Sequence, residues 1–215
     1  MKKLILSVLL MALVKHNSGQ ALANLSAGAG ISENIYLGLG PYTGFNLRAA
    51  YNLGDKGQAF LAFNYSFSRD FSYSADANAL SSLTYPSYIS VPYTDKIQLS
   101  ELHLGYKILL GSENDDDFGF YLHAGLGIVF ASVTTTISSY DHNLYNLSFV
   151  EGTVSEVGFV INAGFGLQYK VGPGYIFLDP RFSIPANRVN NSYVTNPIPI
   201  SVGGILGYRI PFGSK

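Results

Sequence analysis

A two-residue alternation of apolar and polar side chains over residues 58–73 (QAFLAFNYSFSRDFSY) constrains the fold more than any other feature. Apolar or aromatic side chains occupy every odd position except Arg69, and small or polar ones occupy most even positions. This period indicates a β-strand with two unlike faces. An ordinary strand has about 5 to 6 residues, whereas this run would extend for roughly 50 Å at about 3.3 Å per residue. Such a strand needs an apolar environment on one side and a polar one on the other.

The same period recurs along the rest of the chain, which at 215 residues suits one domain. No segment after the N-terminal leader has helical periodicity, so the chain is predicted to be all-β. In one segment the phase changes at Ser100-Glu101, and a β-bulge is predicted there. The expected strands cover residues 25–39, 43–53, 58–73, 91–110, 118–130, 157–171, 175–184 and 201–212.

Short and long connections alternate between these strands. The short turns are rich in Gly, Pro, Asn and Asp, and the long loops in Ser, Tyr and Asn. The short ones are GDKG (54–57), GSENDDD (111–117) and GPG (172–174), and the long ones are 74–92, 138–152 and 187–197. This alternation is typical of a transmembrane barrel with turns in the periplasm and loops outside. We therefore predict a single antiparallel up-and-down transmembrane β-barrel of eight strands, with the excess length of 58–73 projecting as a β-stalk.

The N-terminus has the pattern of an export signal. Lys2 and Lys3 precede an apolar core over 4–14, and Ala21-Leu22-Ala23 is a small-x-small cleavage site. Cleavage after Ala21 or after Ala23 fits the pattern, and the apolar core is too short for a membrane helix, which needs about 20 residues. We expect residues 1–23 to be removed and 24–215 to form the barrel. Removal takes three of the 13 basic residues and none of the 14 acidic ones, which leaves a formal charge of −4.

Composition bears on which face of the strands meets water. Charged residues make up 13% of the chain, about half the usual share of a soluble domain. A water-facing surface usually carries about 25–35% charged residues, so the Phe- and Tyr-rich faces are predicted to meet lipid. The alternative is a soluble exported ligand-binding barrel with its apolar face inward. The absence of Cys excludes disulfides and thiolate sites, and the absence of a basic run argues against nucleic acid as a partner.

Three stretches carry a resemblance to a known family. FYLHAGLGIVF (120–130) and NAGFGLQYKVGPGYIFLDPRFS (162–183) are glycine-rich strands around a short turn, and LGYRIPF (206–212) ends the last strand. In these the chain resembles the small, porin-like outer-membrane β-barrel domain proteins of Gram-negative bacteria. The resemblance implies a location in the cell outer membrane and an assembly signal for the barrel assembly machinery at Tyr208, Ile210 and Phe212. The chain departs from the family pattern in the three residues, 213–215, that follow this signal.

On each strand, the positions that alternate with the apolar ones should point inward, and these positions predict a charged interior. Eight strands enclose a space that side chains can fill, and enclosed charges of both signs should pair. A lumen plugged by such a network is the preferred interpretation, and a narrow pore or small-molecule conduit is the alternative. The candidate lumen residues are Arg48, Glu101, His103, Lys107, His123, Glu156, Lys170, Asp179, Arg181 and Arg209.

The loops suggest contacts rather than chemistry. Tyr with Ser and Asn suits adaptable contact surfaces, so an unknown extracellular partner is expected at Tyr85, Tyr88, Tyr140 and Tyr145. A lipid-modifying enzyme using the loop SSYDHNLYN (138–146) is a weaker alternative, because neighbouring loop residues need not converge. No catalytic residue, cofactor or metal is predicted, since the acidic turn 113–117 lacks the spacing of a calcium loop. The expected protein is a monomer in outer-membrane lipid with a structural or surface-interaction role.

Overall fold

The alternating segments form strands throughout the computed structural model, which describes residues 24–54, 56–110, 118–186, 190–191, 194–195 and 200–212. The predicted signal (1–23), the acidic turn (111–117) and most of the loop 187–197 lie outside the described residues. Among the described residues, no helix is long and apolar enough to cross a membrane. The strands are β1 (Leu25–Tyr36), β2 (Gly40–Asn52), β3 (Gly57–Ser66), β4 (Arg69–Ala79), β5 (Tyr88–Leu109), β6 (Phe118–Ile137), β7 (Tyr145–Asn146), β8 (Gly152–Val171), β9 (Gly174–Pro185), β10 (Asn190–Asn191), β11 (Val194–Thr195) and β12 (Ser201–Pro211).

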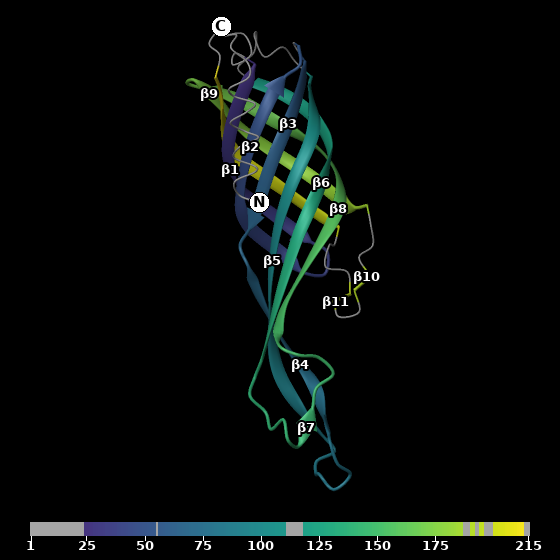
Figure 1. The fold of residues 1–215 in the computed structure, drawn as a ribbon. Helices are drawn as coiled ribbons and strands as arrows, with labels where there is room; N and C mark the ends of the chain where they lie inside the picture. Colours follow the sequence, from purple (N-terminus) through teal and green to yellow (C-terminus); the bar gives the residue numbers. More distant parts are fainter. Residues whose placement is uncertain are drawn as a thin grey trace.

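Eight of these strands close into a barrel (Figure 1). The order β3-β2-β1-β12-β9-β8-β6-β5 runs antiparallel throughout, and pairing of β3 with β5 completes the ring. Closure leaves no sheet edge in this part of the molecule, so the backbone groups of the wall pair with one another. The prediction of an all-β, eight-stranded antiparallel barrel is confirmed.

The wall keeps the two-residue period, with apolar side chains outside and polar ones inside. On β6, Tyr121 is buried and its neighbour Leu122 is exposed, and on β12 Ile205 is buried while Leu206 is exposed. Buried polar side chains line the interior, whereas large apolar side chains stand exposed around the outer wall. Because water-soluble proteins rarely expose so large a continuous apolar surface, the outer face is suited to lipid.

The two described ends of the barrel chain meet at one end of the barrel. The Asn52 amide donates to the Asn24 carbonyl (2.8 Å), and the Phe212 amide donates to the Leu25 carbonyl (2.8 Å). The turn after β2 lies at the same end and is closed by a bond from the Leu53 amide to the Gly57 carbonyl. At the opposite end, β4, β5, β6 and β8 extend well beyond the barrel (Figure 1).

This extension, the part of β4, β5, β6 and β8 beyond the barrel with the segment 138–151, has a core of its own. Ala77, Val91, Tyr145 and Leu147 are buried together there. The segment 138–151 returns over the sheet, and β7 pairs with the end of β4. The predicted loop 74–92 is therefore wrong for most of its length, because its two arms are strands that join only over residues 80–87.

The long alternating run proves to be two strands separated by a bulge at Phe67–Ser68. Tyr65 lies opposite Ser100 of β5, but Arg69 lies opposite Ile97. An advance of four residues along the run therefore corresponds to an advance of only three residues along β5. One extra residue exchanges the two faces of a strand, so odd positions that point outward in β3 pack inward in β4.

The bulge predicted at Ser100-Glu101 is wrong. The ladder between β5 and β6 continues without a break from Tyr93 to Leu109. The apparent change of phase arises because Ile97 and Leu99 are apolar residues that point inward, into a core cluster at the mouth of the barrel. The side chains of β5 therefore alternate inward and outward without interruption. What changes along the strand is the type of residue that points inward, which is apolar at Ile97 and Leu99 and charged at Glu101.

Candidate functional site

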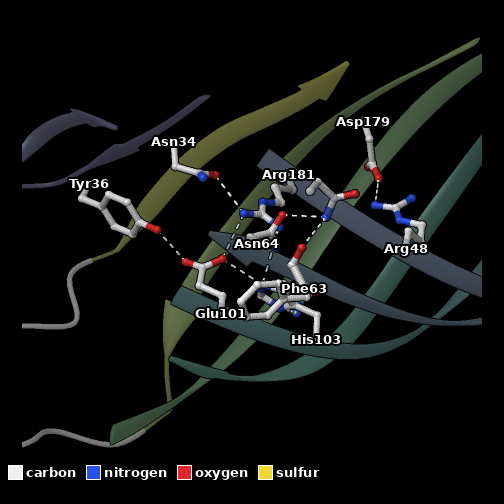
Figure 2. Close-up of polar contacts among 11 residues, drawn as sticks. Asn34, Tyr36, Arg48, Phe63, Asn64, Glu101, His103, Asp179 and Arg181 are labelled. Carbon is white, nitrogen blue, oxygen red and sulfur yellow. Dashed lines mark hydrogen bonds and ion pairs between the residues drawn. The ribbon is translucent and has the colours of Figure 1, made fainter. Parts of the chain in front are cut away.

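The lumen holds a charged network centred on Arg181 of β9, shown in Figure 2. Nη2 of Arg181 donates to Oδ1 of Asn34 (2.9 Å) and to Oε2 of Glu101 (2.9 Å). The Tyr36 hydroxyl donates to the other oxygen of Glu101 (2.7 Å). These groups come from β1, β5 and β9, so one buried ion pair links strands that are not neighbours in the wall.

His103 lies between three members of this network. Its Nδ1 is 2.7 Å from the Asn162 side-chain nitrogen, and its Nε2 is 2.8 Å from Glu101 Oε2 and 3.5 Å from Arg181 Nη1. Besides this imidazole, the layer holds one guanidinium and one carboxylate.

A second charged layer lies toward the end of the barrel that holds Asn24 and Phe212. Arg48 of β2 is paired with Asp179 of β9, and Nε2 of His123 is 2.6 Å from Asp179 Oδ1. The Arg48 guanidinium lies between the rings of Phe60 and Phe177, at 5.0 and 5.2 Å from their centroids. Aromatic faces attract such a cation, so Arg48 is held by a carboxylate and two rings.

A third layer contains two cations near that end. Lys107 Nζ and Arg209 Nη2 both donate to the Gln168 side-chain oxygen, at 3.1 and 3.2 Å. Lys107 also lies over the ring of Tyr121 (4.0 Å), and Arg209 lies over the ring of Tyr175 (4.9 Å). Two cations therefore share one amide oxygen at the end of the barrel that holds Asn24 and Phe212.

At the other end, the mouth of the barrel is filled by apolar side chains. Tyr36 and Tyr42 pack edge to face (5.4 Å between centroids) beside Leu99, Val129 and other buried residues. One carboxylate shares this level: Glu156 lies opposite Ala131, and in the part of the chain that the structure describes neither of its oxygens has a hydrogen-bond partner.

Nine of the ten predicted lumen residues lie inside the barrel or at its mouth. Arg48, Glu101, His103, His123, Asp179 and Arg181 form the first two layers, Lys107 and Arg209 the third, and Glu156 lies at the mouth. Lys170 does not join them: it shares the inward parity, but it lies one residue from the end of β8 and is exposed there.

The neutral members of the network were not predicted. Asn34, Asn162 and Gln168 bind the charged residues directly, and Tyr36 binds Glu101. The alternation along each strand indicates that these side chains point inward. It does not indicate which neutral side chains reach a charged residue on another strand.

The four predicted contact tyrosines have different environments. Tyr85 is 95% exposed at the tip of the extension, and Tyr88 is exposed beside it. Tyr140 is half-buried and stacks on His142 (4.0 Å between centroids). Tyr145 is only 7% exposed, and its hydroxyl donates to the Pro86 carbonyl (3.2 Å). The expectation of a surface contact at Tyr145 is therefore wrong, because this ring is part of the extension's core.

The proposed assembly signal lies on the outer face of β12. Ile210 and Phe212 are exposed, and the half-buried Tyr208 donates its hydroxyl proton to the Val171 carbonyl (2.9 Å). The three side chains thus alternate outward at the end of the barrel that also holds Asn24.

The loop considered for catalysis shows local contacts. The Asp141 carboxylate accepts from the Asn143 amide (2.9 Å), and His142 packs on Tyr140. In the described part of the chain, no group of three or more His, Cys, Asp or Glu side chains is placed to hold a metal ion.

No protein-family model and no curated protein matches the sequence. The fold is similar to solved structures, at low sequence identity. Neisserial surface protein A shares 18% identity (87% of this chain, 95% of that chain, TM-score 0.48). The attachment invasion locus protein Ail of Yersinia pestis shares 16% (87% and 97%, TM-score 0.43), and a major outer membrane protein from Thermus thermophilus shares 14% (86% and 99%, TM-score 0.49).

The geometry itself defines the environment of the barrel. Its wall is closed, its outer surface is apolar around the whole ring, and its interior is polar and charged. In a bilayer every backbone group must pair internally, which among β-structures only a closed barrel achieves, and an apolar outside over a polar inside is the pattern of such barrels. By this architecture, the chain is a β-barrel suited to span a membrane.

Proposed function

We propose that the barrel is a closed anchor and that the extension is a surface-contact module on the outside of the cell. The observation that carries this proposal is the continuation of three wall strands, β5, β6 and β8, which with β4 form a sheet that has a separate core. Ordering so many residues beyond the membrane has a large entropic cost, which is difficult to explain if the barrel alone performed the function.

The tip of the extension has the character of a contact surface. Leu80, Leu83, Tyr85 and Tyr88 are all exposed there, Leu83 to 93%. Contiguous exposed apolar groups commonly mark interaction sites. Beside them, β4 pairs with β5 on one side, and on the other side its described partner is β7 at Asn78 and Ala79 alone. The rest of that edge offers backbone groups to an added strand.

The contact role can be tested on intact cells. Cells producing the wild-type protein are expected to be retained on protein-coated surfaces, and cells producing the variant L83S/Y85S are expected to be retained several-fold less. A control variant, S72N, changes an exposed residue away from the tip. An epitope inserted at Ser82 should be labelled by antibody without permeabilisation. Equal retention of all three strains, or an inaccessible epitope, would contradict the proposal.

The lumen is proposed to be plugged, which makes the barrel an anchor rather than a channel. Support comes from the two ion pairs that join non-adjacent strands and from the apolar cluster at the mouth. In planar bilayers the purified protein should show no steady conductance.

We also propose that it is a monomer without enzymatic activity that contacts lipid around its outer wall and is assembled through the end of β12.

A narrow pore is the second candidate, and one observation favours it. Several buried polar atoms in the lumen have no hydrogen-bond partner, among them Ser32 Oγ, Asn64 Nδ2 and Ser183 Oγ. Buried polar groups usually bind another group or an ordered water, so these atoms favour a hydrated interior. Steady ohmic current that increases in the variant E101Q/R181Q would support a pore and count against the plug.

A further inference from the structure

A cleft of about 830 Å³ lies on the extension, between its sheet and the returning segment 148–152. Its sheet side is the continuation of the barrel's inner face, because Asp95 and Val133 have the same inward parity as the buried Leu99 and Ala131. The lining residues are Tyr93, Asp95, Val133, Thr135, Ser148, Phe149, Val150, Glu151, Gly152, Thr153 and Val154.

The charges of this cleft have one sign. Two lining residues, Asp95 and Glu151, are acidic, and the described lining includes no Lys, Arg or His. Both carboxylates are held in place: the Thr135 hydroxyl donates to Asp95 Oδ1 (2.6 Å), and the Ile137 amide donates to Glu151 Oε1 (2.7 Å). Two fixed negative charges therefore line one open cleft.

An aromatic wall accompanies the carboxylates. The rings of Tyr93 and Phe149 pack at 4.9 Å between centroids, and Tyr73 packs on Tyr93 at 5.4 Å. Burial, followed by the charge of Asp95, raises the pKa of Tyr93, so this ring stays neutral and its face remains electron-rich. Aromatic faces beside carboxylates attract organic cations.

A third carboxylate lies deeper on the same face. Val154 lines the cleft opposite Val133, and Glu156 is the next inward-facing residue of β8, opposite Ala131. Glu156 is 8% exposed, and neither of its oxygens has a hydrogen-bond partner among the described residues. A buried carboxylate without a partner is costly, and a cation that reaches down from the cleft would offset that cost.

We propose that this cleft binds an alkylammonium or guanidinium group on a flexible aliphatic chain, as carried by a polyamine or by the Lys and Arg side chains of a basic peptide. An elongated organic cation fits the arrangement of acids along a cleft with an aromatic wall. A metal ion fits less well, because no metal-holding group of three acids or His is present among the described residues. The proposal depends on the function proposed above only in placing the cleft outside the cell.

The test uses the full mature chain in micelles of an uncharged detergent and two probes, spermidine and tetralysine, titrated by calorimetry. The variant D95N/E151Q should bind at least tenfold more weakly than wild type, and added salt should weaken binding further. Y93A should weaken it about two- to fivefold through the lost ring contact. The matched control, D70N/D76N, removes two exposed carboxylates of β4 that are not in the lining, and it should bind like wild type.

The pattern of results decides the proposal. Binding of tetralysine alone supports a polypeptide ligand, binding of spermidine alone supports a free polyamine, and binding of both supports recognition of the shared cation. Wild-type binding of neither probe overturns the proposal, and so does equal loss in D95N/E151Q and D70N/D76N. A gel-mobility shift on boiling verifies that the barrel of each variant is folded, and resistance of the extension to proteolysis verifies that the cleft is. Because the purified chain is used, failure of the cell-surface role would leave this result unaffected, and the reverse also holds.

Discussion

At the scale of single residues, the interior is organised by charges that reach across the lumen. Arg181 contacts Asn34 and Glu101 from different strands, and Arg48 contacts Asp179 in the same way. A buried ion pair adds little to stability relative to apolar residues of similar size, but removing one partner leaves the other charge buried and uncompensated. The energetic consequence of a mutation here depends on whether one charge or both are removed.

We expect Arg181→Met to lower the free energy of unfolding by about 3–5 kcal/mol, because Glu101 then stays buried without its cation. The double variant E101Q/R181M should lose markedly less. Lys170→Met, at an exposed position that shares the inward parity, should change stability by no more than about 0.5 kcal/mol. Urea titration in detergent, followed by gel mobility, measures all three. If the double variant is as unstable as the single one, the loss of stability comes from the lost ion pair and not from the unpaired charge of Glu101.

At the scale of elements, the bulge at Phe67–Ser68 separates two environments along one run of chain. Before it, odd residues of β3 face outward. After it, odd residues of β4, such as Phe71 and Ala77, pack into core clusters. The single extra residue therefore allows the same alternating sequence to serve a lipid-facing wall and then a sheet with its own core.

Deleting Ser68 should uncouple these two environments. With the extra residue gone, the apolar face of β4 would turn away from the extension's core. The expected result is rapid proteolysis of the extension while the barrel keeps its gel-mobility shift on boiling. Deleting Ser82, an exposed residue in the tip loop, serves as the control and should leave the extension resistant. Resistance of both deletions would indicate that the register of β4 is not determined at the bulge.

Close approach of β2 and β3 gives a second prediction at this scale. A Cβ added at Gly44 would clash with the Tyr65 carbonyl oxygen, whereas one added at Gly204 would meet nothing within 4 Å. Gly44→Ala should therefore lower the free energy of unfolding by about 1–3 kcal/mol, and Gly204→Ala should be close to neutral. Urea unfolding in lipid vesicles measures the difference, and equal effects would count against this pairing of strands.

At the scale of the whole molecule, one apolar band encloses the barrel while the extension carries polar residues on its outer surface. Leu126, in the middle of β6, is 67% exposed on the barrel wall. Leu126→Arg should cost about 2–4 kcal/mol in a bilayer, as for a cation near the midplane. Ser72→Arg, on the exposed part of β4, should be neutral. Unfolding of both variants in lipid vesicles tests this, and a tolerated L126R would contradict lipid contact at that position.

The sequence alone was sufficient to predict the class of fold and most of the interior. A period of two indicates strands, and the low share of charged residues predicts that the apolar face of the wall is the outer one. The residues that alternate with this face are therefore predicted to lie in the lumen. Nine of the ten charged candidates lie there because inward parity is a local property of each strand. Lys170 is the exception, because parity does not reveal where a strand leaves the barrel.

Tertiary structure alone decided what these residues contact. Arg181 meets Glu101 because closure of the ring brings β9 and β5 within reach across the lumen. Tyr145 is buried because the segment 138–151 returns over a sheet in which the bulge at Phe67–Ser68 turns Ala77 toward the same core. The cleft at Asp95 and Glu151 likewise forms only when that segment covers the sheet. The physical reason is common to all three: strand parity is a local property set by backbone geometry, whereas these contacts join residues far apart in the chain and depend on register and closure.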